Sequence, residues 1–573
     1  MKLSILALLT VFLVATPFVA ESQESNDKIQ SANIDQLFKS AFDRGLFNGA
    51  VLVSQNGKAI YKNAFGIAEA TSDRKLNVTS DFYLASVSKQ FTAMCIMLLK
   101  EQGKLDYDDT LDDYFPEFPD YAKSVTVKHM LTHTSGIANH YNLGIYKPGL
   151  TNQEVYETLI KQENLNFNPG EKYEYSNGGY VMLALITEKV SGMPMHKFMD
   201  LYIFKPLDMS RSLVYHAATP NIENRAVGYT DTGELDDYVI LTTGAGGLFS
   251  SVEDLYKWDQ ALYSEKLVSK ATLEEAFTPT ILNNGEVSNY GYGWSITEND
   301  HKKSVSHSGS LSGYRTYIRR NLYDKSGYII LTNDGGRSDI GALGYALDNI
   351  LTGQSFELPK RPIAKVVQKE LDADSSKNLI SVVKELMETY PDEYAIDEMR
   401  INRLGYSYLR LNDIDKALKI FELNTKLNPE SSNVYDSLGE ALLIKGDSAS
   451  AIANYQRSYT LNRNNSNAIE ILNRIGTDTS KLTADVVVAD STLKDYVGVY
   501  VLDPNMTLDI SFNGGQLYIH PTGQNKSPIY PSTKTRFYSK VVNAQLTFNK
   551  DENGKVASLT LHQNGDHLAV RDE

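Results

Sequence analysis

Cysteine is nearly absent from this chain, since Cys95 is the single copy among 573 residues. No internal disulfide can form, and the paired Cys-x-x-Cys spacing of structural zinc sites is missing. Cys95 itself stands in an apolar run, where a buried and inert thiol is the expected state. The sequence therefore predicts no disulfide framework, no metal site and no cofactor.

Basic residues are also scarce relative to acidic ones, with 56 Lys and Arg against 71 Asp and Glu and a formal net charge of -15. Nucleic-acid binding needs clustered positive surface charge, so we expect no nucleic-acid partner. After the first 25 residues no apolar stretch is long enough to cross a bilayer, and we expect no transmembrane anchor in the mature chain. A small molecule or a peptide is the substrate class that this composition favours.

The first residues carry a positive charge at Lys2 and a short apolar run that ends at about Phe18. Small residues follow, and Ala20-Glu21-Ser22 offers a cleavage point. This order is typical of a secretory signal peptide. We expect residues 1–22 to be removed and the mature protein to be exported, either to the periplasm or out of the cell.

The first half of the chain mixes strand-like and helix-like patterns. Apolar and polar residues alternate on both sides of Asn56-Gly57 and predict a β-hairpin. Strand-like runs return at 314–320 and 327–333, and helical segments are expected at 94–102, 178–192, 251–264 and 341–353. This order predicts an α/β (α+β) domain with an antiparallel sheet over residues 30–355. Residues 356–376 contain two prolines and are expected to form a linker.

The segment that starts at Ile401 repeats itself 34 residues later, from Tyr435. Small and apolar residues recur at this displacement: Leu404 and Leu438, Gly405 and Gly439, Ala417 and Ala451, Phe421 and Tyr455. A 34-residue helix-turn-helix unit of this kind resembles the tetratricopeptide repeat. With flanking helices, the repeats are expected to occupy residues 377–478 and to offer a surface for a protein partner.

The sequence pattern changes again towards the C-terminus. Short strand-like runs alternate there with Asn-Gly turns at 513–514, 553–554 and 564–565. This pattern predicts a small all-β barrel or sandwich over residues 485–573. The module resembles the lipocalin-like β domains that accompany some exported hydrolases.

Ser86 and Lys89 stand one helical turn apart at the start of an apolar helix, in YLASVSKQFTAMCIMLL. A serine hydroxyl is a poor nucleophile without a neighbouring base, and lysine becomes a base only where burial lowers its pKa. The N–H groups at the start of a helix suit a developing oxyanion. The spacing alone is weak evidence, because it recurs at Ser25/Lys28, Ser72/Lys75, Ser381/Lys384 and Ser491/Lys494. A helix-capping serine beside a solvated lysine explains such pairs equally well.

Two further clusters strengthen the case for chemistry. Tyr175 and Asn177 precede an apolar helix; a tyrosine beside an ammonium group can exchange protons as a phenolate, and an asparagine amide can bind a carbonyl. His307 and Gly309 are expected at the head of a strand, where the glycine would let a substrate backbone approach. The N–H of Ser310 is then a candidate oxyanion donor. By itself, His307 reads more simply as a loop histidine.

In this order, Ser-x-x-Lys, Tyr-x-Asn and His-x-Gly resemble the motif set of the penicillin-recognising serine hydrolases. That superfamily includes class C β-lactamases, D-Ala-D-Ala carboxypeptidases, D-aminopeptidases and esterases. Segments such as VTVKHMLTHTSGI, PGEKYEYSN and GAGGLFSSVEDLYKW resemble the same family. The resemblance covers residues 30–355 and implies a β-lactamase/transpeptidase-like catalytic domain, followed by the helical repeats and the small β domain.

The resemblance also implies what each motif residue does. Ser86 would be acylated, Lys89 would activate it, and Tyr175 would pass the proton to the leaving group. Asn177 would orient the acyl side chain, and the N–H groups of Ser86 and Ser310 would form the oxyanion hole. His129 and His133, in the segment 125–137, are expected to be structural.

One departure from the family pattern bears on the substrate. His307 stands where most β-lactamases have a lysine, and a histidine is largely uncharged near neutral pH. This change weakens the case for a dedicated β-lactamase and favours the esterase or aminopeptidase-like branches of the family. The resemblance as a whole implies a serine hydrolase of ester or amide bonds, with esterase, D-amino-acid peptidase or carboxypeptidase activity. A different class of function stays open: a penicillin-binding sensor, or a scaffold whose repeats recruit a partner while the hydrolase domain turns over little substrate.

Overall fold

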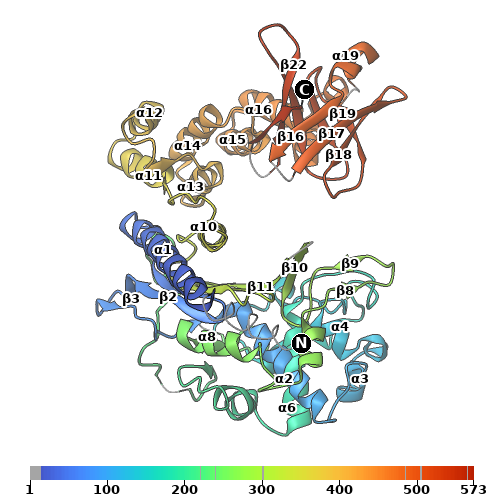
Figure 1. Ribbon diagram of the computed structural model, residues 1–573. Coiled ribbons are helices and arrows are strands. Elements are labelled where there is room, and N and C mark those ends of the chain that lie inside the picture. The colour runs from blue at the N-terminus through green and yellow to red at the C-terminus, as the bar shows by residue number, and fades with distance from the viewer. Residues whose placement is uncertain are drawn as a thin grey trace, which may run out of the picture. The chain divides into compact units, whose positions relative to one another are not determined.

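The computed structural model describes residues 15–219, 221–238, 240–299, 302–483, 486–503, 506–563 and 566–572. They belong to two compact units, Met1–Pro359 and Lys360–Glu573. In Figure 1 the first unit is drawn in blue to yellow-green and the second in yellow to red. Most of the apolar run expected in a signal peptide lies outside the described residues, so that peptide stays a prediction. Within the described ranges, no helix has the length and apolar character needed to cross a membrane.

The first unit is organised around one antiparallel sheet of six strands, in the order β10-β11-β12-β13-β1-β2. The strands are β1 (Gly49–Gln55), β2 (Lys58–Phe65), β10 (Ser295–Asn299), β11 (Lys302–Leu311), β12 (Tyr314–Asn321) and β13 (Gly327–Thr332). The predicted hairpin is β1–β2, and Asn56 and Gly57 take the positive φ angles, 51° and 73°, that a primed turn needs. Because β1 pairs with β13, strands from both ends of the domain meet inside the sheet. The α+β prediction is confirmed.

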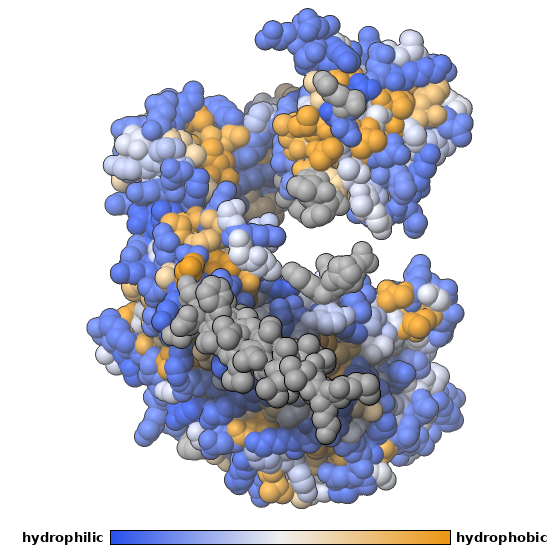
Figure 2. All heavy atoms as spheres, viewed as in Figure 1, coloured by the Kyte–Doolittle hydropathy of each residue, from blue (hydrophilic) through white to orange (hydrophobic). Residues whose placement is uncertain are grey.

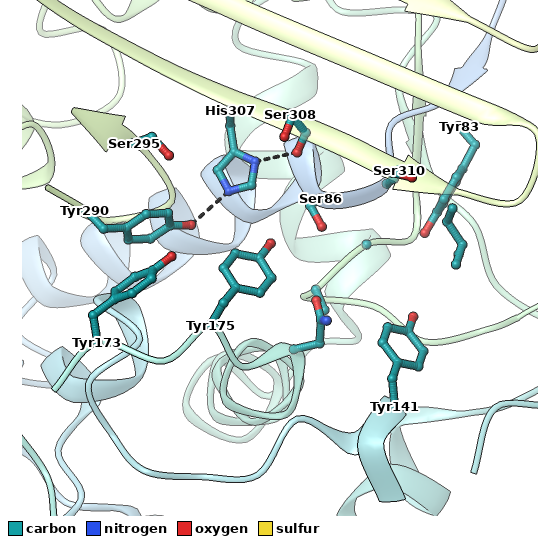
Figure 3. A pocket seen from close by; sticks show the side chains of 15 residues that line it. Tyr83, Ser86, Tyr141, Tyr173, Tyr175, Tyr290, Ser295, His307, Ser308 and Ser310 are labelled. Carbon is teal, nitrogen blue, oxygen red and sulfur yellow. Dashed lines mark hydrogen bonds between the residues drawn. The ribbon is translucent and has the colours of Figure 1, made fainter. Parts of the chain in front are cut away.

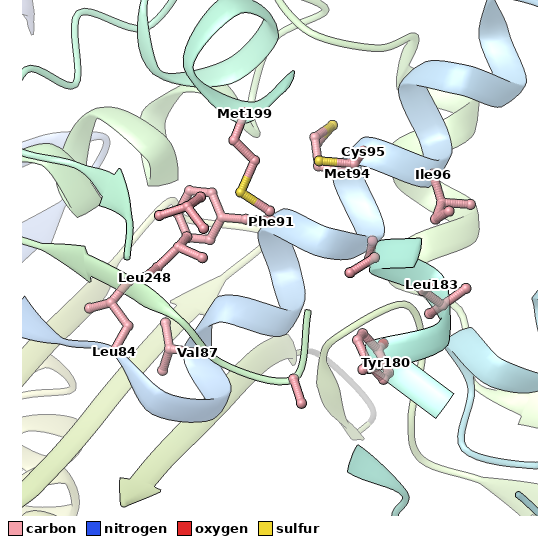
Figure 4. Close-up of a cluster of buried hydrophobic side chains, with 14 of the residues drawn as sticks. Leu84, Val87, Phe91, Met94, Cys95, Ile96, Tyr180, Leu183, Met199 and Leu248 are labelled. Atoms are coloured by element: carbon pink, nitrogen blue, oxygen red, sulfur yellow. The ribbon is translucent and has the colours of Figure 1, made fainter. Parts of the chain in front are cut away.

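Helices cover both faces of this sheet (Figure 1). Alternate residues of β1 point to opposite faces: Val51 and Val53 pack with α1 (Ala15–Asp43) and α10 (Ile340–Leu351), whereas Ala50 and Leu52 join the larger core. That larger core contains α2 (Lys89–Glu101), α6 (Asn177–Ser191) and α8 (Val252–Ala261). Figure 4 shows α2 crossing it, with apolar side chains on every side of the helix.

Shorter elements complete the first unit. The helices are α3 (Leu111–Tyr114), α4 (Val127–Leu131), α5 (Asn152–Leu159), α7 (Met195–Met199) and α9 (Lys270–Ala276). The strands are β3 (Ile67–Glu69), β4 (Arg74–Lys75), β5 (Phe82–Tyr83), β6 (Leu213–Val214), β7 (Leu248–Ser250), β8 (Thr280–Ile281) and β9 (Val287–Ser288). Of these, β5, β7 and β6 form a small sheet, and β5 lies just before the start of α2 in the chain.

The second unit begins with helices in antiparallel pairs. They are α11 (Ile363–Ala373), α12 (Leu379–Thr389), α13 (Glu398–Arg410), α14 (Ile414–Leu427), α15 (Ser432–Lys445), α16 (Ser448–Leu461), α17 (Ser466–Arg474) and α18 (Ser480–Thr483), with the short strands β14 (Arg361–Pro362) and β15 (Tyr394–Ala395) beside them. The predicted repeats are the pairs α13–α14 and α15–α16. Gly405 lets the two helices of the first repeat touch, because a Cβ there would lie 2.4 Å from the ring of Phe421.

The linker expected at 356–376 is wrong in part, because α11 lies within it. Ile363, Val367 and Leu371 are buried in the same core as the repeat helices. Pro362 stands at the start of this helix, where the missing N–H of a proline costs nothing. The prolines that suggested a linker therefore mark a helix start.

The chain ends in a closed barrel of eight strands that follows the short helix α19 (Asp490–Asp495). The strands are β16 (Gly498–Asp503), β17 (Met506–Asn513), β18 (Gln516–Pro521), β19 (Ser527–Pro531), β20 (Arg536–Ser539), β21 (Gln545–Lys550), β22 (Val556–His562) and β23 (Asp566–Arg571). Each pairs with its neighbour in sequence, and β16 closes the barrel against β23. The all-β prediction is confirmed in its barrel form; the expected turn at 564–565 lies outside the described residues.

Candidate active site

Ser86 lies in a 3-10 turn, Ala85–Ser88, which runs directly into α2 at Lys89. The predicted arrangement is therefore right in outline, with the nucleophile candidate one tight turn ahead of the α-helix. Ser86 is half-buried, whereas the side chain of Lys89 has no exposed surface. A hydroxyl at the surface of the core thus stands directly above an amine inside it.

The turn before Ser86 has a strained backbone, since Ala85 adopts a φ of 48°, a left-handed value that non-glycine residues rarely take. Three neighbours hold it in place. The N–H of Leu84 donates to the Leu248 carbonyl at 2.8 Å, and the Leu84 carbonyl accepts from Thr316 Oγ1 at 2.7 Å. A Cβ on Gly309 would lie 2.3 Å from that same carbonyl oxygen. Gly309 therefore makes room for the turn that carries Ser86, and its expected role beside a substrate backbone stays a prediction.

Lys89 is surrounded by oxygen acceptors. Its Nζ lies 2.8 Å from Asn177 Oδ1, 2.8 Å from the Ala245 carbonyl and 3.1 Å from Ser86 Oγ. Burial lowers the pKa of Lys89 well below its ordinary value. A neutral amine has two N–H bonds, and Asn177 and Ala245 accept both, so its lone pair is left for the Ser86 hydroxyl.

Tyr175 and Asn177 lie on either side of Ser176, whose side chain caps α6 by accepting the N–H of Gly179. Figure 3 shows the Tyr175 hydroxyl directed towards Ser86. Desolvation in the pocket raises the pKa of Tyr175, and its interaction with the Ser86 hydroxyl opposes that shift only in part. The raised pKa favours a neutral phenol in the resting site, where the sequence also allowed a phenolate.

His307 lies inside β11, five residues after the strand begins, and not at its head as predicted. Its Nδ1 is 2.7 Å from the Ser308 carbonyl, and its Nε2 is 2.9 Å from Tyr290 Oη. A carbonyl can only accept, so Nδ1 carries the proton and Nε2 accepts from Tyr290. Burial, with a contribution from Lys89, lowers the pKa of His307 to about 3, and the side chain is neutral at physiological pH.

One cavity of about 510 Å³ brings most of the predicted residues together (Figure 3). Ser86, Tyr175, Asn177, His307 and Ser310 line it, while Lys89 lies beneath Ser86 and Gly309 behind it. No Lys or Arg side chain is among the described residues that line the cavity. Within the described ranges there is also no cluster of His, Cys, Asp and Glu suited to a metal ion.

Four tyrosines of the cavity were not identified from the sequence: Tyr83, Tyr141, Tyr173 and Tyr290. Tyr290 belongs to the segment YGYGW, which has no motif role of its own. Tyr83 and Tyr173 lie in the segments YLASVSKQFTAMCIMLL and PGEKYEYSN but outside their motif positions, and Tyr141 is one of 36 tyrosines with no pattern around it. With Tyr175, they give the cavity a wall of aromatic rings and hydroxyl groups.

Comparison with known proteins identifies the family. Residues 33–350 match the family model described as Beta-lactamase. The chain belongs to the beta-lactamase family. Penicillin-binding protein 4* of Bacillus subtilis (strain 168) is 37% identical to it over 358 residues, which cover 58% of this chain and 78% of that protein. The domain that contains the pocket at Ser86 therefore belongs to a superfamily of serine hydrolases.

Solved structures show the same fold. An octameric penicillin-binding protein homologue from Pyrococcus abyssi matches with a TM-score of 0.52 and 20% identity, over 94% of this chain and 99% of that one. EstCE1, described as a hydrolase with promiscuous acyltransferase activity, matches with a TM-score of 0.50 and 20% identity, over 57% of this chain and 99% of that one. Outside the beta-lactamase domain, residues 401–431 and 432–465 match tetratricopeptide repeats, and 485–571 match a domain of unknown function.

The buried amine of Lys89 predicts a specific change of stability with pH. The folded protein binds this proton more weakly than the unfolded chain, whose lysine titrates near about 10.4. Folding at neutral pH therefore costs the free energy of removing that proton, and this cost fades as the pH rises towards that value. Replacing Lys89 by Met removes the titration. The free energy of unfolding of wild type should therefore rise relative to that of Lys89→Met between about pH 7 and about pH 10.

Urea unfolding followed by tryptophan fluorescence measures this difference, because Trp258 and Trp294 both lie in the first unit. Lys104→Met, at an exposed position just after the same helix, is the matched control. A wild-type-to-Met difference that stays constant over this pH range would contradict a lowered pKa at Lys89.

Proposed function

We propose that this protein hydrolyses uncharged esters or amides through an acyl-enzyme formed on Ser86. The observation that carries the proposal is the position of Lys89 Nζ, buried and 3.1 Å from Ser86 Oγ with its other neighbours acting as acceptors. An amine held in this way can take a proton from the hydroxyl as Ser86 attacks.

The protonation states of the site separate the work of Lys89 and Tyr175. Lys89 accepts the Ser86 proton while the bond between Oγ and the carbonyl carbon forms. Tyr175, kept as a phenol, donates its own proton to the leaving group as the bond between the carbonyl carbon and that group breaks. Lys89 then returns a proton to Tyr175, and the same groups act in reverse on the water that releases the acyl group. The N–H groups of Ser86 and Ser310 would stabilise the oxyanion, and Asn177 would orient the acyl chain.

The lining of the cavity supports a neutral substrate. His307 is uncharged and holds a hydrogen bond to Tyr290, so the third motif offers no cation for a carboxylate. The five tyrosines of the cavity suit an apolar or aromatic acyl group with hydrogen-bonding atoms at its edge. The lining therefore suits esters and D-amino-acid peptides that place no carboxylate beside His307.

We further propose that the mature protein is exported. The signal-like start of the sequence supports this location, as does the similarity to a penicillin-binding protein of Bacillus subtilis. A peptide or ester substrate outside the cytoplasm is consistent with it.

The tetratricopeptide repeats support a protein partner for the second unit. Met399, Leu411 and Ile444 are 59%, 76% and 52% exposed on the repeat helices or their ends. Figure 2 shows hydrophobic residues on the surface of this helical segment among hydrophilic ones. Exposed apolar side chains on a repeat array are typical of a surface that binds another protein.

Labelling of Ser86 tests the catalytic proposal directly. A fluorophosphonate should add once to the wild-type chain, and intact-mass analysis should show no adduct on Ser86→Ala. Ser88→Ala is the matched control, because Ser88 lies in the same turn but is fully buried, and it should label like wild type. Absence of an adduct on wild type would contradict the acyl-enzyme. A lasting adduct with fluorescent penicillin and no turnover would favour the sensor instead.

A matched pair of esters tests the charge of the substrate. We expect p-nitrophenyl butyrate to exceed p-nitrophenyl hemisuccinate in kcat/KM by about 10- to 100-fold, since no cation offsets desolvation of the carboxylate, worth about 1.5–3 kcal/mol. A D-amino-acid p-nitroanilide and a chromogenic cephalosporin complete the panel. Rapid cephalosporin turnover, or equal rates for the two esters, would overturn the neutral-substrate proposal.

The partner surface is tested with the full chain as bait in an envelope extract. Leu411→Asp combined with Ile444→Asp should lose any partner that wild type retains, because charge at these positions disrupts an apolar contact. Tyr345→Asp, at a 71% exposed residue of the first unit, is the control and should keep the partner. Equal capture by all three baits would argue against binding through the repeats.

A further inference from the structure

His133 follows α4 and adopts a φ of 57°, in the left-handed region that histidine takes only rarely. Its side chain is buried, with 1% of its surface exposed, and it is not among the residues that line the active-site cavity. It therefore lies behind the lining of the cavity. A strained backbone held beside a reactive site is a feature that needs a reason.

The contacts of His133 enclose Tyr175 from both sides along the chain. The His133 carbonyl accepts the N–H of Glu174 at 2.9 Å, and its Nδ1 accepts the N–H of Ser176 at 3.2 Å. The residues before and after Tyr175 are thus both bonded to one histidine. Its ring also packs on the Tyr175 ring, with 4.2 Å between the centroids.

The same imidazole contacts the tyrosine that orients His307. The centroid of the Tyr290 ring lies 4.8 Å from that of His133. Because Nδ1 accepts a backbone N–H, the proton of the neutral ring is on Nε2, which has no hydrogen-bond partner among the described residues. Protonation of Nδ1 would remove the acceptor for Ser176, and burial lowers the pKa of His133 and so opposes it.

We propose that His133 is a positioning residue that fixes where the Tyr175 hydroxyl lies relative to Ser86. The inference rests on the proposed function, in which Tyr175 donates a proton to the leaving group. The left-handed backbone is what lets one residue present its carbonyl to Glu174 and its ring to Ser176. Proton transfer depends steeply on this geometry, and a displacement of about 1 Å can cost about 100-fold in rate.

Two substitutions separate the backbone from the side chain. His133→Gly accepts the left-handed φ without strain but removes the acceptor and the ring. His133→Asn also tolerates this φ and places an amide oxygen near the position of Nδ1, so it restores the bond to Ser176. We expect Gly to lower kcat for p-nitrophenyl butyrate by about 10- to 100-fold with KM within about threefold of wild type, and Asn to recover most of the loss.

Thermal melts and the fraction of chains labelled by fluorophosphonate show whether each variant is folded. His129→Asn is the control, because His129 lies four residues earlier and exchanges hydrogen bonds with Thr126 at the start of α4. The effect should also vanish when Tyr175 is replaced by Phe: if His133 acts through the Tyr175 hydroxyl, the two losses in acylation rate do not multiply.

The outcomes are distinguishable. An inactive wild type that takes up no label refutes the proposed function itself. If wild type is active, an equally active His133→Gly variant refutes the positioning role. A His133→Gly variant whose KM rises at unchanged kcat also refutes it. So does a His133→Asn variant no more active than a folded His133→Gly variant, and so do losses that multiply when His133→Gly is combined with Tyr175→Phe.

Discussion

The side chain of Lys89 has no exposed surface, so every hydrogen-bond partner of its amine must come from the protein. A buried donor without an acceptor costs about 1–3 kcal/mol, so the chain must supply oxygen atoms at fixed positions. Asn177 comes from the start of α6 and the Ala245 carbonyl from the loop before β7, while Ser86 comes from the turn before α2. One amine thus joins three segments that are distant in sequence, and its lone pair faces the hydroxyl of Ser86.

The pocket above that amine works with neutral groups. Its tyrosines and the neutral His307 supply hydroxyl and imidazole dipoles, and no Lys or Arg is among the described lining residues. Dipoles fixed by a folded framework stabilise charge only where it develops during the reaction, which is how such sites lower a barrier. The hydrogen bonds from Tyr290 to His307 and from His307 to Ser308 fix one tautomer, so the orientation of these dipoles does not depend on pH near neutrality.

The sequence predicts those parts of the site that accompany a local pattern. Ser86, Lys89, Tyr175 and Asn177 each adjoin the start of an apolar helix, and helix starts can be recognised locally. The position of His307 within β11, the packing role of Gly309 and the choice of tautomer depend on strands and helices that are remote in sequence. The same holds for α11: its prolines are local, but the core that buries Ile363 and Val367 is built by helices that follow later. Tyr83 and Tyr141 reach the pocket only through the tertiary fold.

The register of the six-strand sheet has a consequence for the order of events during synthesis. Gly49 pairs with Thr332, and closing so long a loop is slow because its entropy must be lost before any contact is gained. The turn that carries Ser86 is held by Leu248, Gly309 and Thr316, all of which leave the ribosome long after the serine itself. In the barrel, by contrast, every pairing joins strands that are consecutive in sequence, except for the closing pair of β16 and β23. A nascent chain therefore has no complete pocket around Ser86 until most of the beta-lactamase domain has been made, and the pocket stays unassembled for as long as the chain remains unfolded.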